Sequence, residues 1–194
     1  MAKKKDLKKV IILNNNSTQE INYSDPRPLK DLKDLVSKNQ SGLIFCFGTS
    51  FTSQLIKAKT RLYTNEQVPS HVAVYHKGFI YESTTMDEHV GVKYIPSGVR
   101  RWLITDYLKA ERKRNTRYVF IPIGVDIAVL ERYIHYPYGI DTIVDYMFKD
   151  NSNGHSKGLI CSQYANYATK LINKECVTPA ELYRRALIIS KGVN

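Results

Sequence analysis

The chain has 194 residues, of which 43% are hydrophobic and 24% charged, with a formal net charge of +11. This length and composition are typical of one globular domain with an ordinary core. No apolar run approaches the roughly 20 residues of a membrane span, which excludes a transmembrane segment.

Two short segments carry most of the positive charge. Residues 1–10 contribute +4 and residues 109–117 another +4, which leaves +3 for the rest of the chain. Such patches can bind phosphates or an acidic surface, and they also occur as a solvated tail and a solvated loop. A nucleic-acid partner therefore stays open as an alternative, although we do not expect specific binding.

The N-terminal fifth of the chain is predicted to be a basic extension over residues 1–40, ahead of one domain over residues 41–194. Its apolar segment Val10–Leu13 is shorter than the core of a signal peptide, so we expect a cytoplasmic protein. Three cysteines without paired spacing argue against a disulfide framework and for a reducing compartment. A short amphipathic helix is predicted from Leu29 to about residue 40.

The middle of the chain is predicted to contain a buried strand and a hairpin. Residues 42–47 form a continuous apolar run of strand length, and a helix is expected over about residues 50–59. Residues 70–76 and 79–84 read as two strands joined by the turn Lys77-Gly78. A two-residue turn pairs His76 with Phe79, which puts His71 and Glu82 diagonally adjacent on one face.

The second half is predicted to alternate strands and helices. The expected elements are a strand over residues 91–96, a helix over 98–109, a strand over 117–123, and helices over 125–136, 141–148, 161–173 and from 179 onward. Thr178 is expected to cap the last helix, with a proline at its first position.

Cys161 stands at the start of one of these helices, after a glycine and two apolar residues. The positive end of a helix dipole and free backbone N–H groups favour a thiolate over a thiol. A small buried apolar residue is the alternative interpretation, because most free cysteines are of that kind.

Cysteine, histidine and an orienting acid together perform thiol-based acyl transfer. Cys161 is the candidate nucleophile, His71 the candidate base and Glu82 the residue that orients it; the backbone N–H of Cys161 is a candidate oxyanion donor. No pair of histidines has metal-ligand spacing and no glycine-rich phosphate loop occurs, so we expect neither a metal nor another cofactor.

The order of these motifs resembles the circularly permuted NlpC-type papain-like superfamily, in particular its YiiX-like branch. The similar segments are Ser70-His71-Val72-Ala73-Val74-Tyr75, then Ile80-Tyr81-Glu82, Gly91-Val92, Trp102, Pro137-Tyr138, Cys161-Ser162-Gln163 and Thr178-Pro179-Ala180-Glu181-Leu182. The resemblance covers about residues 41–188. Two positions depart from the family pattern: Leu43 stands where the family often has Asp, and Gln163 where it often has Glu.

The resemblance implies an α+β papain-like fold, with a small antiparallel sheet packed against helices and the cysteine at a helix N-terminus. It places nucleophile, base and third polar residue on Cys161, His71 and Glu82. The candidate substrate-binding residues flank these motifs: Ser70, Tyr138, Ser162 and Gln163.

The function implied by the resemblance is a cysteine hydrolase or acyltransferase. Its substrate would contain an amide, thioester or ester bond, in a peptidoglycan peptide or a lipid or acyl-amide. The alternative is a non-catalytic structural or adaptor protein, such as a component of a phage or viral particle, that docks protein partners through residues 1–40. The protein would then lie in the virion or the host cytoplasm.

Overall fold

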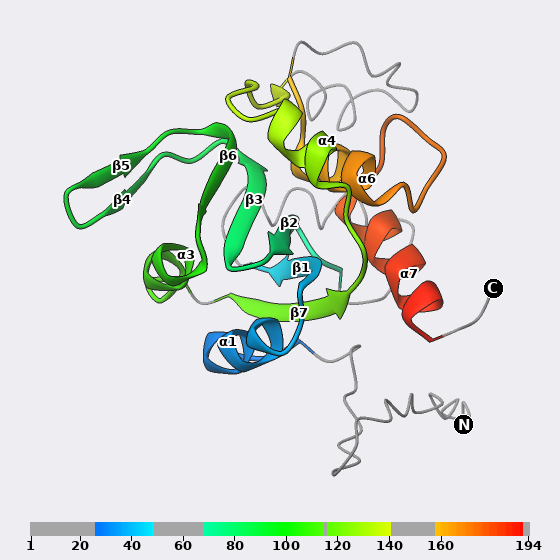
Figure 1. Cartoon of the computed structure of the whole chain (residues 1–194), viewed down its shortest axis with the longest axis horizontal. Coiled ribbons are helices and arrows are strands. Elements are labelled where there is room, and N and C mark those ends of the chain that lie inside the picture. Colours follow the sequence, from blue (N-terminus) through cyan, green and yellow to red (C-terminus); the bar gives the residue numbers. More distant parts are fainter. Residues whose placement is uncertain (1–25, 49–67, 115, 141–157, 192–194) are drawn as a thin grey trace, which may run out of the picture.

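A five-stranded antiparallel sheet forms the centre of the molecule (Figure 1). This computed structural model describes residues 26–48, 68–114, 116–140 and 158–191. The strand order is β6-β3-β2-β1-β7, with bounds β1 Ser41–Phe47, β2 His71–His76, β3 Phe79–Thr84, β6 Gly98–Leu103 and β7 Arg117–Pro122. All four neighbouring pairs are antiparallel.

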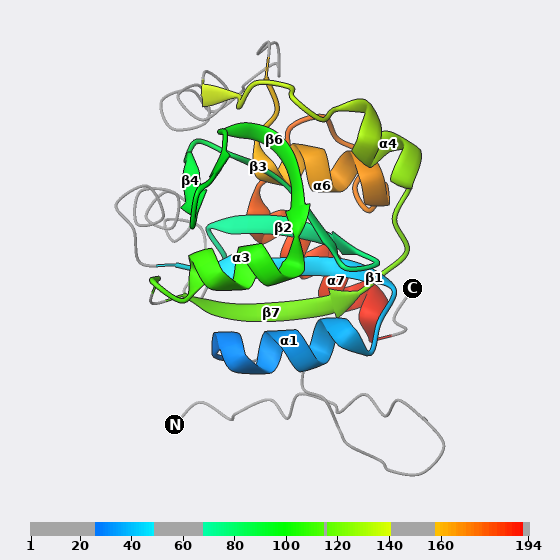
Figure 2. The ribbon, with the colours of Figure 1, turned by 60° about the vertical axis from the view of Figure 1, so that its left-hand side comes forward.

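Helices cover both faces of this sheet, so the described residues form three layers (Figures 1 and 2). One face carries α4 (Ile127–Arg132), α6 (Cys161–Thr169) and α7 (Pro179–Ser190), and the other carries α1 (Leu29–Ser37) and α3 (Ile104–Glu111). The predicted α+β class, with an antiparallel sheet packed against helices, is confirmed.

Strand β1 shows why its sequence is apolar without interruption. Leu43 and Phe45 pack into the core on the α6 and α7 side, whereas Ile44 and Cys46 pack into the core on the α1 and α3 side. A strand buried on both faces needs apolar residues at every position. The prediction of a buried strand over residues 42–47 is confirmed.

Two predictions for residues 91–109 are wrong in part. Residues 88–95 form a separate two-stranded hairpin of β4 (Glu88–Val90) and β5 (Lys93–Ile95), which projects from the sheet, rather than one strand over 91–96 (Figure 1). The helix predicted over 98–109 begins only at Ile104, because residues 98–103 form β6. Val99 and Trp102 are buried on opposite faces of the sheet, so β6 lacks the alternation of apolar and polar residues by which a strand is recognised in a sequence.

The last two helices begin where the sequence predicts. Helix α7 follows a capping box, in which Glu181 N donates to Thr178 Oγ1 at 3.1 Å and Thr178 N donates to Glu181 Oε2 at 2.8 Å. Helix α6 begins at Cys161 and ends at Thr169, earlier than predicted, where Lys170 adopts a left-handed conformation (φ 53°). Helix α4 is likewise shorter than the predicted 125–136.

The N-terminal helix packs on the body of the domain. Leu32 and Val36 of α1 are almost fully buried in the core, and Arg27 forms a bridge with Tyr118 of β7. The rest of the predicted extension, before residue 26, and the helices predicted over 50–59 and 141–148 lie outside the described residues. Within the described ranges, no helix has the length and apolar character to span a bilayer.

Candidate active site

The β2–β3 hairpin brings His71 and Glu82 together. His76 pairs with Phe79 across the turn, which confirms the two-residue turn at Lys77 and Gly78. Both turn residues have positive φ, 43° and 88°, as a hairpin turn of this length favours. His71 Nε2 lies 2.8 Å from Glu82 Oε2, so the imidazole donates a hydrogen bond to the carboxylate. The predicted same-face placement is confirmed.

Arg100 holds the other oxygen of this carboxylate. Its Nε and Nη2 atoms donate to Glu82 Oε1 at 3.0 and 2.7 Å. Arg100 lies opposite Glu82 in the β3–β6 register, and each side chain is about 5% exposed or less. Burial opposes ionisation of Glu82, but the Arg100 charge and the hydrogen bond from His71 outweigh it and lower the pKa to about 2. Glu82 is therefore a carboxylate at neutral pH.

The third residue, Cys161, reaches His71 from helix α6. This helix packs on β2 and β3, and Cys161 is its first residue, as predicted. The Cys161 side chain lies near enough to the His71 ring for its charge and hydrogen-bonding capacity to raise the pKa of the imidazole. Because Nε2 is bonded to Glu82, Nδ1 is the ring nitrogen left for the sulfur. The backbone N–H of Cys161, as the first in the helix, has no acceptor within the helix.

The protonation of His71 follows from these neighbours. Burial lowers the pKa of the imidazole, but the negative charge and hydrogen bond of Cys161, followed by those of Glu82, raise it to about 10. The imidazolium form of His71 therefore persists at neutral pH. The His71 side chain is 26% exposed, so this site opens to solvent on the imidazole side, whereas Cys161 is 4% exposed.

Tyr138 lies close to Cys161. Residues 138 and 159 form a parallel β-bridge, and residue 159 precedes Cys161 by two positions. A Cβ atom on Gly158 would lie only 2.6 Å from Pro137 O and from Tyr138 C, so the absence of a side chain there permits this approach. Burial, and then the negative charge at Cys161, raise the pKa of Tyr138 well above its usual range. Tyr138 therefore stays a neutral hydroxyl that can donate a hydrogen bond.

The other candidate substrate-binding residues point their polar atoms into the protein. Ser70 Oγ lies 3.4 Å from the Cys46 carbonyl oxygen, and Ser162 Oγ donates to the Val177 carbonyl. Gln163 is 2% exposed, and its Oε1 accepts from Ile160 N at 3.2 Å, which caps the start of α6. Gln163 thus performs the capping that a glutamate at this position would perform.

Cys46 has a different environment from Cys161. It is buried on β1, and its Sγ lies 3.5 Å from the Tyr107 hydroxyl. Burial, together with the charge of Glu111, raises the pKa of this thiol well above its usual value. Cys46 is therefore an inert thiol. Among the described residues, no cluster of His, Cys, Asp and Glu side chains has the arrangement of a metal site.

Arg100 is the site residue that the sequence did not predict. The sequence predicts a helix over residues 98–109, in which Arg100 and Trp102 would not share a face. In the strand β6 they do, because side chains two residues apart point to the same face of the sheet. One signal could have found Arg100: a buried glutamate needs a positive partner.

Comparisons with known proteins do not assign the chain. No family model matches it, and searches of curated proteins and of solved structures find no significant match.

Proposed function

We propose that the protein is a cysteine hydrolase or acyltransferase of the permuted NlpC-type papain-like kind, acting on an amide, thioester or ester bond. The observation that carries this proposal is the chain of contacts from the Cys161 thiol through the His71 imidazole to the Glu82 carboxylate. Together they supply the three groups that acyl transfer uses: a nucleophile at a helix start, a base and an orienting acid.

The proposed reaction uses Cys161 as a thiolate and His71 in its protonated form. The Cys161 thiolate attacks the carbonyl carbon of the substrate, and a C–S bond forms as the carbonyl oxygen becomes negatively charged. Protonated His71 then gives its proton to the leaving amine, alcohol or thiol as the bond to it breaks. Neutral His71 next takes a proton from water, or from an acceptor alcohol or amine, which attacks the thioester and restores the thiolate.

Two groups are candidate donors to the oxyanion. One is the backbone N–H of Cys161, and the other is the hydroxyl of Tyr138, which remains protonated because burial and the neighbouring thiolate oppose its ionisation. Donors fixed before the reaction contribute a large part of catalysis in such sites.

A test of this function is acylation of the full-length protein by a p-nitrophenyl ester, followed by mass spectrometry of its peptides. We expect the acyl group on Cys161 and not on Cys46, whose raised thiol pKa makes it an internal control. His71→Ala should slow the release of p-nitrophenol by about 100-fold or more. A Cys161 that takes up no acyl group in a folded protein would contradict the proposal and favour the structural or adaptor role.

A further inference from the structure

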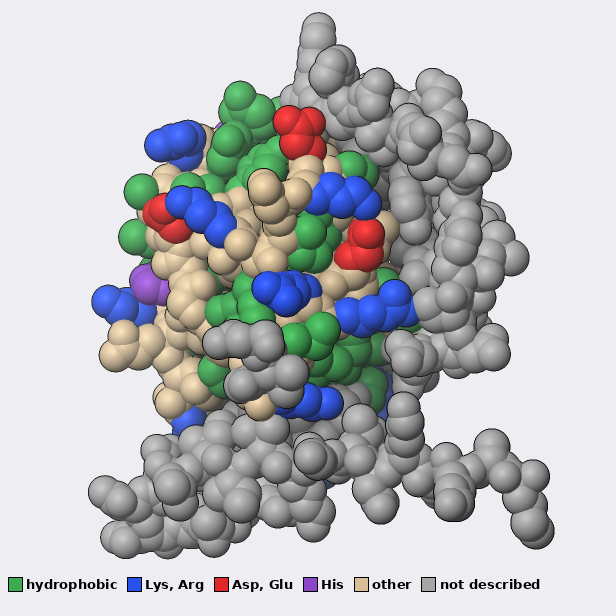
Figure 3. Space-filling view, turned by 90° about the vertical axis from the view of Figure 1, so that its right-hand side faces the viewer, with side chains coloured by type: hydrophobic (Ala, Val, Ile, Leu, Met, Phe, Trp, Pro, Cys, Tyr) green, Lys and Arg blue, Asp and Glu red, His purple; other side chains and the backbone are tan. Residues whose placement is uncertain are grey.

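Basic side chains are unevenly distributed over the described surface. On the side of the molecule where α7 lies in Figure 1, Lys and Arg side chains lie apart from one another, among acidic and hydrophobic ones (Figure 3). On the α1 and α3 face, by contrast, lysines of α1 come together with arginines from the basic segment 109–117. The sequence separates these two groups by some eighty residues.

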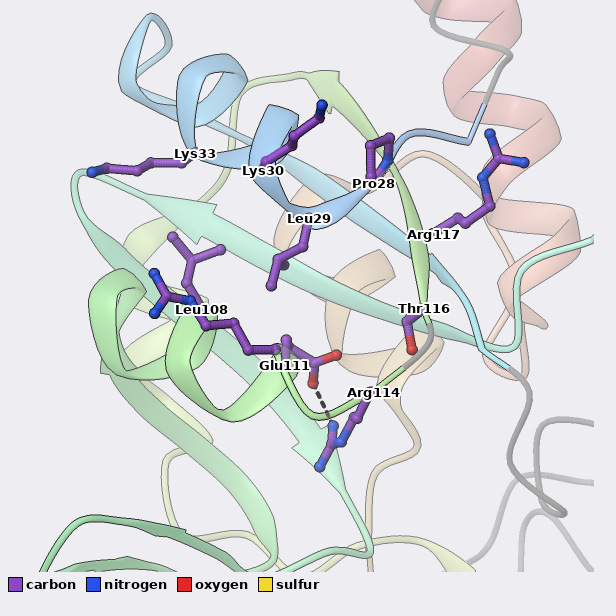
Figure 4. A pocket seen from close by; sticks show the side chains of 10 residues that line it. Pro28, Leu29, Lys30, Lys33, Leu108, Glu111, Arg114, Thr116 and Arg117 are labelled. Carbon is purple, nitrogen blue, oxygen red and sulfur yellow. Dashed lines mark hydrogen bonds and ion pairs between the residues drawn. The ribbon is translucent and has the colours of Figure 1, made fainter.

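The cations surround a pocket of about 830 Å³ between the start of α1, the end of α3 and the start of β7 (Figure 4). This volume is in the range of small-molecule sites. None of Cys161, His71, Glu82 and Arg100 lines the pocket, although the lining residue Glu111 lies near enough to Glu82, His71 and Arg100 for their charges to affect its pKa.

Five of the six charged side chains that line the pocket, among the described residues, are cations. Lys30, Lys33, Arg112 and Arg117 form no ion pair with any residue in the described ranges. In Figure 4, Lys30 and Lys33 extend from α1, and Arg117 extends from the start of β7. Four like charges around one cavity favour a ligand that carries more than one negative charge.

The single acidic residue in the lining, Glu111, does not oppose such a ligand. Arg114 pairs with its carboxylate on the pocket side (Figure 4), and the Tyr118 hydroxyl donates to it from the core at 2.5 Å. Burial raises the pKa of Glu111 to about 7, against the hydrogen bond from Tyr118. The remaining lining is largely apolar, from Pro28, Leu29 and Leu108.

We propose that this pocket binds a small organophosphate, with its phosphate among the lysines and arginines and its organic part against the two leucines. Arginine and lysine are the side chains that bind phosphate groups most often, and the arginine fork matches phosphate oxygens. No aromatic side chain lines the pocket among the described residues, so it lacks the stacking surface on which single-stranded nucleic acids rest their bases.

The experiment is calorimetric titration of the full-length protein with octyl phosphate below its micellar concentration, in parallel with inorganic phosphate and 1-octanol. We expect octyl phosphate to bind more tightly than inorganic phosphate, and 1-octanol to give no saturable binding. Raising the salt concentration should weaken the binding of both phosphates.

The matched variants are Lys33→Gln/Arg112→Gln at the pocket and Arg132→Gln on α4, an exposed arginine on the opposite side of the sheet. The double variant should raise the Kd for octyl phosphate about tenfold, since each exposed cation contributes a modest electrostatic interaction. Arg132→Gln should leave the Kd unchanged. Circular dichroism melting of each variant establishes whether it is folded. If the double variant is not folded, Lys33→Gln and Arg112→Gln are measured separately in its place.

Three results would overturn the proposal. The first is an octyl phosphate Kd that the folded pocket variants do not change. The second is the absence of binding by either phosphate. The third is binding of a fluorescent single-stranded RNA or of phosphatidic acid vesicles that the pocket variants weaken, while octyl phosphate does not bind; the site would then be a nucleic-acid or membrane surface.

Discussion

Arg100 places two nitrogen atoms on a single oxygen of Glu82, at 2.7 and 3.0 Å, inside the protein. The same guanidinium donates from Nη1 to the carbonyl oxygens of Met86 at 2.8 Å and Pro96 at 3.2 Å. It therefore joins the carboxylate that orients His71 to the base of the β4–β5 hairpin. A buried pair of this kind is costly to break, because the remaining charge has no partner.

Arg100→Ala should lower the free energy of unfolding by about 3–5 kcal/mol. The adjacent Arg101 gives a matched control, since its side chain is 47% exposed and pairs with the 42% exposed Glu131. Arg101→Ala should cost less than about 1 kcal/mol, because solvent screens an exposed pair. Urea unfolding of both variants measures the difference. Equal losses for the two variants would mean that Arg100 does not hold a buried charge.

The hairpin half of the site could be predicted from the sequence. Lys77 and Gly78 fix the register between two short strands, and period-two alternation then places His71 and Glu82 on one face. These are local rules, which act over about a dozen residues. The departure at Gln163 also has a local explanation, because an amide oxygen caps a helix as a carboxylate does.

The rest of the site depends on contacts that local rules do not determine. Cys161 reaches His71 because α6 packs across β2 and β3, and the sequence supplied this only through a family resemblance. Arg100 was hidden because β6 is buried on both faces, so its apolar residues fit helical spacing as well as strand spacing. The basic pocket was missed for a similar reason, since Lys30 and Lys33 join Arg112 only through the packing of α1.

Stability at acid pH should report on Glu82. Its pKa is about 2 in the folded protein and about 4.5 when unperturbed, so the folded state binds its proton less readily than the unfolded state. The resulting stabilisation is present above about pH 4.5 and is lost as the pH falls through about 2. For this shift it is on the order of 3 kcal/mol.

Unfolding by urea at several pH values between 6 and 2 checks this effect. Glu82→Gln should be less stable than the natural protein at pH 6, and the gap between them should narrow as the pH falls toward 2. Glu131→Gln is the control, because its 42% exposed carboxylate pairs with Arg101 at the surface and accepts from the Tyr81 hydroxyl, which an amide oxygen can also accept. A gap for Glu82→Gln that is independent of pH would argue against an ionised Glu82.

The protonation of His71 should depend on the thiol. The pKa of His71 is raised to about 10 against the effect of burial, and Cys161 makes the largest favourable contribution. Cys161→Ala should therefore lower the pKa of His71, so that the imidazolium loses its proton at lower pH. Long-range ¹⁵N–¹H NMR of the imidazole gives the titration directly.

The control for this titration is Cys176→Ala, which removes a thiol that does not contribute to the pKa of His71. We expect its titration to match that of the natural protein. A His71 pKa that stays near 10 in Cys161→Ala would mean that Glu82 alone stabilises the imidazolium. It would then argue against an ion pair between a Cys161 thiolate and a His71 imidazolium.

The close approach at Gly158 should be necessary for the geometry around Cys161. A Cβ atom there would lie 2.6 Å from the Pro137 carbonyl oxygen and from the Tyr138 carbonyl carbon, distances that backbone atoms do not tolerate. Gly158→Ala should therefore move the segment bearing Tyr138 away from the start of α6. We expect a loss of stability of about 1–3 kcal/mol, as for other forced contacts in a packed interior, and slower acylation of Cys161.

Gly124 offers the matched control, because a Cβ atom at this position would meet no atom within 4 Å. Gly124→Ala should leave both the urea unfolding midpoint and the rate of acylation close to those of the natural protein. Tyr138→Phe separates the two effects of Gly158→Ala, since it removes the hydroxyl but leaves the backbone in place. If Tyr138→Phe slows acylation while Tm changes little, the hydroxyl acts on the reaction. If only Gly158→Ala slows it, the bridge between residues 138 and 159 instead holds Cys161 in position.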